Sequence, residues 1–203
     1  MSIVEIKKED ITHIAKVLAV AFREDPIFKY IFQTEEKYDK SAVWIFSTWI
    51  RWAILFGKAW MTEDRKAVVL MRSLRSPEMS LLSMIRAGML LTPLKLGFTS
   101  FRRFYFQVVT VLDKKHKEIM GTQPHWYGWM IGVIPEQRGA GRDLMSYCFK
   151  IADEYHLPIF LETATQRNVA LYNHRHFQVR DKIEFTPGDF NLYFMVRDPQ
   201  TAV

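Results

Sequence analysis

The feature that most constrains the fold is an apolar run, HWYGWMIGVI, which begins at His125 and leads through a glycine-containing loop into an amphipathic helix. A nearly continuous apolar run is typical of a strand that is covered on both faces. Over residues 142–155, apolar residues recur on one helical face and charged residues on the other. A second short strand is expected at 158–163, parallel to the first. This order of strand, helix and strand predicts an α/β (α+β) domain.

The rest of the chain predicts helices and hairpins on either side of this segment. Asp10 stands where a helix cap is expected, and that helix must end near Asp25, because a residue before proline is disfavoured in a helix. An apolar stretch at 79–95 is interrupted by Arg86 and is too short to span a bilayer, so we interpret it as a buried or pocket-lining helix rather than a membrane-associated one. The other expected elements are a strand at 3–6, helices at 37–55, 80–91, 100–120 and 168–175, and hairpins over 57–71 and 177–196.

Composition favours one cytoplasmic domain. Hydrophobic residues make up 49% of the 203 residues, enough for a substantial core, and no repeat or linker divides the chain. The single cysteine, Cys148, excludes an internal disulfide and a cysteine-rich zinc site, and the N-terminus lacks the apolar core of a signal peptide. The 28 basic and 22 acidic residues give a formal charge of +6, which suits a polyanionic partner: nucleic acid, an acidic surface or a phosphate-rich cofactor.

The loop within IGVIPEQRGAGR, residues 131–142, is the segment that points to chemistry. A glycine-containing loop that feeds a helix presents unpaired backbone N–H groups and the positive end of the helix dipole, which suit phosphate oxygens. Arg138 and Arg142 bracket the glycines and could add charge-assisted hydrogen bonds. The alternative is a tight turn that needs small residues, with both arginines on a solvated rim.

The run 126–177 resembles the acetyl-CoA-binding core of the GNAT N-acetyltransferase superfamily, in which a strand is followed by Val-x-Pro-x-x-[Arg/Gln]-Gly-x-Gly, a helix and a strand, and then by a helix that carries Asn and Tyr. The matching residues are Gly132 to Glu136, Arg138 to Gly141, Leu157, Pro158, Leu161 to Thr163, Arg167, Asn168, Tyr172 and Phe177. The whole chain is most similar to puromycin N-acetyltransferase and its small-amine-acetylating relatives. The earlier matches are Ala21, Phe22, Asp25, Pro26, Gly57, Lys58 and Trp60.

The resemblance implies one GNAT-like domain over residues 1–203, with a strongly twisted mixed sheet, flanking helices and a splayed pair of parallel strands. The N-terminal half would form the substrate side, and residues 125–178 would form the acetyl-CoA-binding core. Acetyl-CoA would be the co-substrate and a small primary amine the acceptor, with no metal, no nucleic acid and no membrane involved. The protein would act as a monomer or a homodimer.

The resemblance also implies roles for individual residues. The residues implied for binding acetyl-CoA are Ile131, Gly132, Val133, Arg138, Gly139, Ala140, Gly141, Arg142, Asn168 and Tyr172. The pantetheine arm would pair with the strand 130–133, where Gly132 would allow close approach, and the pyrophosphate would lie on the loop. Asn168 would bind the arm or an ordered water. Tyr172 would protonate the departing thiolate after direct attack by the amine, without a covalent enzyme intermediate.

Some positions depart from the family pattern. The loop is two residues shorter than usual when it is aligned from the helix, and Asp143 replaces Gly or Ala when it is aligned from Pro135. His156 and His176 also stand where glycine is usual. These departures keep open an alternative: a catalytically weak or inactive GNAT-fold protein that binds CoA or a partner. A third hypothesis is nucleic-acid binding by the basic surface.

Several side chains are candidates for handling the amine and its proton. His125 has a suitable ordinary pKa but lies at the start of its strand, where packing is the alternative. Glu162 is a second candidate base, with an ion pair as its alternative role. Glu24 and Asp25 could hold a cationic amine, and Tyr127 could contact the substrate. For Tyr172 the alternative is core packing, and His174 and His176 lack an acidic or cysteine partner at ligand spacing, so we expect no metal site.

Overall fold

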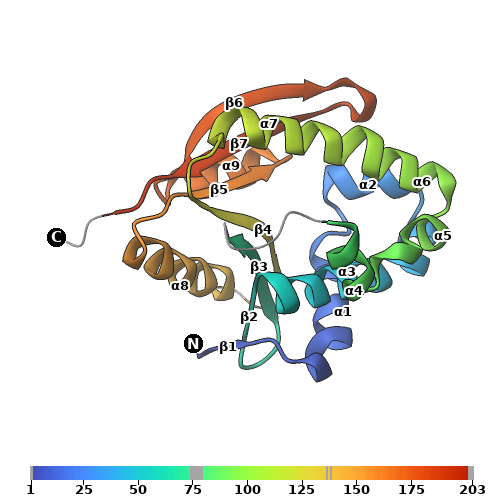
Figure 1. Cartoon of the computed structure of the whole chain (residues 1–203), viewed down its shortest axis with the longest axis horizontal. Coiled ribbons are helices and arrows are strands. Elements are labelled where there is room, and N and C mark those ends of the chain that lie inside the picture. The colour runs from blue at the N-terminus through green and yellow to red at the C-terminus, as the bar shows by residue number, and fades with distance from the viewer. Residues whose placement is uncertain (1, 74–79, 136, 138, 201–203) are drawn as a thin grey trace.

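A computed structural model describes residues 2–73, 80–135, 137 and 139–200. Its centre is a seven-stranded sheet in the order β1-β2-β3-β4-β5-β7-β6 (Figure 1). The strands are β1 Ile3–Glu5, β2 Lys58–Thr62, β3 Ala67–Ser73, β4 Trp126–Val133, β5 Ile159–Thr163, β6 Gln178–Phe185 and β7 Phe190–Arg197. Neighbouring strands are antiparallel except β4 and β5, which are parallel. The α/β architecture with a parallel strand pair is confirmed.

Helices precede the central strands and connect them. The longer helices are α1 Ile11–Ala21, α2 Pro26–Phe32, α3 Glu35–Phe56, α4 Leu81–Ala87, α7 Thr110–Met120, α8 Ala140–Glu154 and α9 Gln166–Asn173. Shorter segments are α5 Thr92–Leu96, α6 Phe98–Arg102, the π-helix η3 Arg103–Val109, and the 3-10 helices η1 Lys8–Asp10, η2 Met89–Leu91 and η4 Thr186–Gly188. The helix expected at 80–91 ends early because Gly88 adopts φ 80°, and Gly97 at φ 73° separates α5 from α6.

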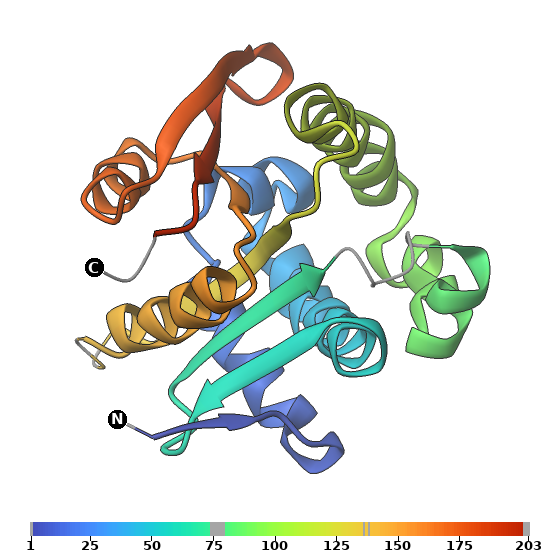
Figure 2. The same cartoon turned by 60° about the vertical axis from the view of Figure 1, so that its left-hand side comes forward.

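The sheet separates two hydrophobic cores. On one face α1 and α3 pack against β3, and their buried side chains include Leu18, Phe46 and Trp52. On the other face α8 packs against β2, β3 and β4 through Leu144 and Cys148. Figure 2 shows α8 across one face and α1 and α3 behind the other. The expected helices on both faces of the sheet are therefore present.

The parallel strands β4 and β5 separate soon after they begin. They pair only at Trp126 with Ile159 and at Tyr127 with Phe160. On the other side of β4 the register with β3 shifts between Leu70 and Met71, so that Trp129 is an extra, bulged residue. A bulge bends a strand and increases its twist. The bulge lies just beyond the point where the two strands separate, and a splayed pair of parallel strands is what the family resemblance implied.

Two expectations about the N-terminal half are corrected. Asp10 does not cap α1 through its side chain; its carboxylate instead accepts a hydrogen bond from the Lys7 N–H at 3.0 Å. Asp25 does not end a long helix: α1 ends at Ala21, and Asp25 caps a separate helix, α2, by accepting from the Ile27 N–H at 2.9 Å. Pro26 follows directly, at the first position of α2, where its missing N–H costs nothing.

The expectation that residues 79–95 form a buried or pocket-lining helix is also wrong for the part that the structure describes. From residue 80 onward the segment is broken into α4, η2 and α5, and Leu82, Leu90 and Leu94 are exposed. In the described part of the chain, no helix combines the length and apolar character that crossing a bilayer would require.

Candidate functional site

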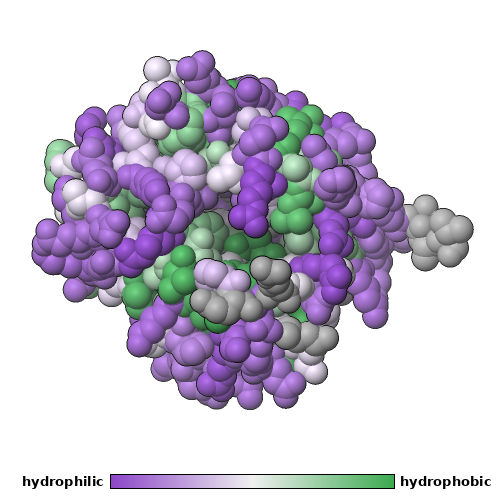
Figure 3. Space-filling model, turned by 180° about the vertical axis from the view of Figure 1, so that it is seen from behind, coloured by the Kyte–Doolittle hydropathy of each residue, from purple (hydrophilic) through white to green (hydrophobic). Residues whose placement is uncertain are grey.

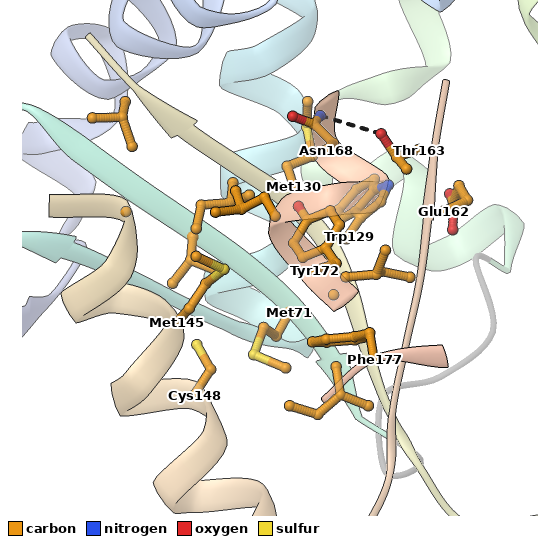
Figure 4. Close-up of a pocket in the computed structure, with 18 of the residues that line it drawn as sticks. Met71, Trp129, Met130, Met145, Cys148, Glu162, Thr163, Asn168, Tyr172 and Phe177 are labelled. Atoms are coloured by element: carbon orange, nitrogen blue, oxygen red, sulfur yellow. Dashed lines mark hydrogen bonds between the residues drawn. The ribbon is translucent and has the colours of Figure 1, made fainter. Parts of the chain in front are cut away.

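A cavity of about 290 Å³ lies where β4 and β5 separate. Both strands contribute to its wall, together with residues of α8, α9 and the segment that leads into α2. Most of the wall is apolar, and Figure 4 shows Met130, Met145, Tyr172 and Phe177 around the space. The ionisable side chains in the wall, apart from the buried thiol of Cys148, are Asp25, Glu162 and Tyr172. The sequence named all three as candidates, and the fold brings them to one cavity.

Glu162, on β5, is the carboxylate best suited to accept a proton here. One oxygen, Oε1, accepts a hydrogen bond from the Tyr127 hydroxyl, and the other, Oε2, is buried without a hydrogen-bond partner among the described residues. Burial raises the pKa of Glu162 to about 7, against the opposing effects of the Tyr127 hydrogen bond and the positive charge of Arg72. Near neutral pH the group can therefore both take up and release a proton.

Tyr127, which the sequence suggested as a substrate contact, does not line the cavity. Its side chain is buried on β4 and its hydroxyl holds the Glu162 carboxylate. Burial and the adjacent carboxylate raise the pKa of Tyr127 well above its ordinary value, so it stays a hydrogen-bond donor. Tyr127 therefore orients the Glu162 carboxylate.

His125 also lies outside the cavity wall. Its Nδ1 is 2.7 Å from the Gln123 carbonyl oxygen, and its Nε2 is 2.6 Å from Nε2 of His116. Burial lowers the pKa of both rings, to about 4 for His116, and both are therefore neutral at physiological pH. With both nitrogens engaged away from the cavity, His125 is not placed to act as the base.

Tyr172 reaches the cavity from α9. Its side chain is buried, and this burial raises its pKa to about 12, with further contributions from the charges of Glu162 and Asp25. A phenol with such a pKa is protonated at neutral pH and can donate its proton. Tyr172 therefore lines the same cavity as the carboxylates of Glu162 and Asp25.

The two acidic candidates near α2 lie in different surroundings. Asp25 lines the cavity, and burial raises its pKa to about 6 although it accepts the Ile27 N–H. Glu24 is exposed and forms an ion pair with Lys29 outside the cavity. Only Asp25 is therefore placed to meet a ligand in the cavity.

Strand β4 and the start of α8 meet at the end of the cavity where a phosphate-bearing ligand was expected. Ile131, Val133 and Gly141 line the cavity, whereas Gly132 faces away. A Cβ on Gly132 would lie 2.8 Å from Cδ2 of Leu18, so this glycine makes room for α1 rather than for a ligand. From the sequence, Gly132 was expected to allow close approach of the pantetheine arm, and this expected reason is corrected.

The loop before α8 has the backbone expected of a helix start. Gly139 adopts φ 89° at the N-cap, and Ala140 is buried as the first residue of the helix. Arg142 is largely exposed, with Nε 3.4 Å from the Asp143 carboxylate. The Asp143 charge is therefore partly offset by a neighbouring cation. Arg138 lies outside the described residues.

Asn168 joins the end of β5 to α9. Its side-chain amide donates to Thr163 Oγ1 at 3.2 Å, shown as a dashed line in Figure 4, and its backbone N–H donates to Thr165 Oγ1 at 3.3 Å. Both Asn168 and Thr163 line the cavity. The pair fixes the direction of α9 and therefore the position of Tyr172.

The two histidines at usual glycine positions take the backbone that glycine favours. His156 has φ 53° and His176 has φ 66°, each just after a helix. In both turns the next N–H reaches back to the helix: Leu157 to the Ala152 carbonyl at 2.9 Å, and Phe177 to the Tyr172 carbonyl at 3.1 Å. The turns that glycine usually makes are therefore present, although a side chain at a positive φ strains the backbone.

Sequence reasoning missed part of the cavity's surroundings. Trp129 lines the cavity at the bulge, and its ring centroid lies 5.6 Å from each of Trp49 and Trp52. Arg72 lies with its guanidinium carbon 5.4 Å from the Tyr127 ring centre, where its charge acts on Glu162. No local pattern distinguishes these residues, because only the packing of α3 and β3 beside β4 brings them to the site.

Comparisons with known proteins agree with this geometry. No family model matches the chain. An uncharacterized N-acetyltransferase of Schizosaccharomyces pombe is 25% identical over 209 residues, covering 99% of this chain and 85% of that protein. A solved Corynebacterium glutamicum structure, described as histone acetyltransferase HPA2 and related acetyltransferase, matches with TM-score 0.65 and 17% identity over 100% of this chain and 98% of that one. The fold is that of the GNAT acetyltransferases.

A further GNAT-fold neighbour is named for its amine substrate. Arylalkylamine N-acetyltransferase 2 of Aedes aegypti matches with TM-score 0.63 and 11% identity, over 98% of this chain and 99% of that one. The name of the yeast relative and these structural neighbours together support the GNAT superfamily. The specific likeness to puromycin N-acetyltransferase stays a prediction.

Proposed function

We propose that this protein transfers an acetyl group from acetyl-CoA to the primary amine of a small molecule. The observation that carries the proposal is the pairing, in one cavity between splayed strands, of a carboxylate with a pKa of about 7 and a phenol with a pKa of about 12. The GNAT fold and the acetyltransferase names of its relatives support the same reaction.

The shape of the site suits a pantetheine thioester. After Tyr127, the side of β4 that faces β5 has no strand partner among the described residues, so its backbone groups are free to pair with an amide-bearing arm. The adjoining cavity wall is apolar, and the 15-residue helix α8 directs its N-terminus toward the same end, where Gly141 lines the cavity. The pantetheine arm would be held by Ile131, Val133 and Gly141. The diphosphate would be bound by the backbone amides that follow Gly139.

The residues divide the proton transfers between them. When bound, the thioester supplies an acetyl group whose carbonyl carbon is open to attack by an amine. Glu162 accepts one proton from the substrate ammonium, so that the nitrogen can form the new N–C bond while the C–S bond breaks. Tyr172 donates its proton to the departing sulfur and regains one as the second N–H proton leaves the new amide. The products are an N-acetyl amine, CoA and one proton released to solvent through Glu162.

The cavity also favours a cationic acceptor. Asp25 adds a second carboxylate to the same wall as Glu162, and Trp129 adds an aromatic face next to them. A protonated amine is attracted to both features before it loses its proton. A small amine of the kind named for the mosquito enzyme fits this description.

An assay of thiol release tests the proposal. The protein is mixed with acetyl-CoA and a panel of aromatic and aliphatic primary amines, free CoA is measured with a thiol reagent, and the acetylated amine is identified by mass spectrometry. Glu162→Gln is expected to lower kcat by about 10²- to 10⁴-fold, the usual contribution of a general base. The exposed Glu154→Gln, at the other end of α8, serves as a matched control and is expected to be unchanged.

Tyr172→Phe separates catalysis from binding. Removal of the hydroxyl is expected to lower kcat by about tenfold or more while the affinity for acetyl-CoA, measured by calorimetry, stays the same. The exposed Tyr155→Phe is the matched control. If acetyl-CoA binds but no amine in the panel is acetylated, the alternative of a silent CoA-binding protein is favoured. If acetyl-CoA does not bind, both readings fail.

A further inference from the structure

One end of the molecule carries an unusual amount of exposed apolar surface. Leu94 is 78% exposed and Phe98 79% exposed, and Leu81, Leu82, Leu90 and Leu91 are each more than half exposed. We call these six residues the α4–α6 surface. Soluble domains rarely leave contiguous apolar patches of this kind uncovered unless something binds there.

An exposed aromatic cluster continues this surface into η3. Phe101 stacks on Tyr105 with ring centres 5.7 Å apart, and Phe106 meets Tyr105 edge-on at 5.3 Å. Phe106 is itself well exposed. Aromatic rings of this kind are common at the boundary between water and lipid.

The charges in this part of the chain all have one sign. Residues 80–112 contain four basic residues and no aspartate or glutamate. Arg86, Lys95 and Arg102 are exposed, whereas Arg103 turns inward and donates to the Tyr30 carbonyl at 3.1 Å. Within this described segment the exposed charges are therefore all positive, and an apolar surface that carries cations is complementary to an anionic surface.

The position of this surface leaves it accessible. Figures 1 and 2 both place α4, α5 and α6 at one end of the molecule, away from α8 and α9. None of its residues lines the cavity between β4 and β5. Figure 3 shows the back of the molecule, whose surface is largely hydrophilic and whose hydrophobic residues gather mainly near the middle of this face.

We propose that the α4–α6 surface docks on the anionic face of a lipid bilayer. Short helices with protruding leucine and phenylalanine side chains can lie in the plane of the interface, with their apolar side chains among the upper acyl groups and their cations beside lipid phosphates. A symmetric contact between two copies is disfavoured, because it would place Arg86, Lys95 and Arg102 against the same residues without acidic partners from this segment. The proposal concerns where the protein is located and does not depend on the proposed reaction.

Vesicle flotation with the full chain tests the proposal. The protein is incubated with vesicles of phosphatidylcholine alone, or with roughly one third phosphatidylserine, and the floated fraction is measured at low and high salt. We expect binding to the anionic vesicles, weaker binding to the neutral ones, and loss at high salt, because the Debye length falls to about 3 Å at 1 M. Absence of binding to both vesicle types would overturn the proposal.

Substitutions locate the contact. Leu94→Ser combined with Phe98→Ser is expected to reduce vesicle binding at least about tenfold, because both side chains lose their apolar insertion. Tyr155→Ser removes a similarly exposed apolar side chain at the end of α8 and is expected to bind like the unaltered protein. The melting temperature and the circular dichroism spectrum of each variant verify without any ligand that the fold is intact, so failure here and failure of the proposed reaction are distinguishable.

Two results would contradict the assignment. Vesicle binding that survives the double substitution would show that another surface makes the contact. A dimer in solution that the double substitution dissociates, together with no vesicle binding, would show that a second copy covers this surface instead. Light scattering during size-exclusion chromatography of the same proteins measures the second outcome.

Discussion

Replacing Glu162 by glutamine is expected to change how the stability of the protein depends on pH. The glutamine keeps the shape of the side chain and can still accept the Tyr127 hydroxyl, but it cannot titrate. In the folded protein, burial raises the pKa of Glu162 from an ordinary value near 4.5 to about 7. The unfolded chain has the ordinary value.

The sign and the size of the effect follow from proton binding. Between pH 4.5 and pH 7 the folded state holds the Glu162 proton more tightly than the unfolded state, so the free energy of unfolding falls as pH rises through this window and then levels off. At about 1.4 kcal/mol for each pH unit, the gap amounts to about 3 kcal/mol. The free energy of unfolding of Glu162→Gln does not fall in this way, because glutamine does not titrate. Relative to the unaltered protein, the variant should therefore gain about 3 kcal/mol between about pH 4.5 and about pH 8.

Denaturant unfolding of both proteins across this pH range measures the difference. Other titrating groups, such as Asp25 and His116, contribute equally to both proteins and cancel in the comparison. Glu154→Gln, on the exposed end of α8, is the control and should change by less than about 0.5 kcal/mol. Parallel curves for the unaltered protein and Glu162→Gln would refute the reasoning, because they would mean that Glu162 titrates normally in the folded state.

Two backbone positions give further predictions. Gly132→Ala should lower the free energy of unfolding by about 1 to 2 kcal/mol, because the new methyl group would lie 2.8 Å from Cδ2 of Leu18 on α1. Gly128→Ala is the control and should change the free energy of unfolding little, because its methyl group would meet neighbours only at 3.6 Å. Equal effects of the two substitutions in denaturant melts would count against this packing. His176→Gly should raise the free energy of unfolding by about 0.5 to 1 kcal/mol, because φ is 66° there and glycine adopts this backbone conformation without strain. His174→Gly should lower the free energy of unfolding, because φ is −65° at that position. A stabilising His174→Gly would contradict the backbone argument.

Much of the C-terminal half could be predicted from the sequence because its signals are local. Local residue patterns predict the apolar strand β4, the amphipathic helix α8 and the short strand β5. Their order along the chain indicates a crossover between two parallel strands. Tyr172 was a candidate because of the family resemblance, and Glu162 and Asp25 were candidates because carboxylates can handle an amine and its proton. All three line the cavity, although their chemical roles stay proposals.

The parts that the sequence did not predict depend on contacts between distant segments. Glu162 lines the cavity and His125 does not, because the cavity opens where β4 and β5 separate, beyond the start of β4, and no pattern in either strand shows where this separation begins. Tyr127 was expected to meet substrate, but β5 places Glu162 against its hydroxyl. The exposure of Leu94 could not be read from composition, because an apolar helix can be covered or left bare by its neighbours.

Hydrogen exchange of the backbone amides, with and without acetyl-CoA, tests the central claim most directly. In the proposed complex, the gap between β4 and β5 receives the thioester. Saturating acetyl-CoA should slow exchange in β4 after Tyr127 and in the first turn of α8, while the turn that joins β6 to β7 exchanges as before. Unchanged exchange in β4 and α8, or protection confined to another part of the molecule, would contradict the account.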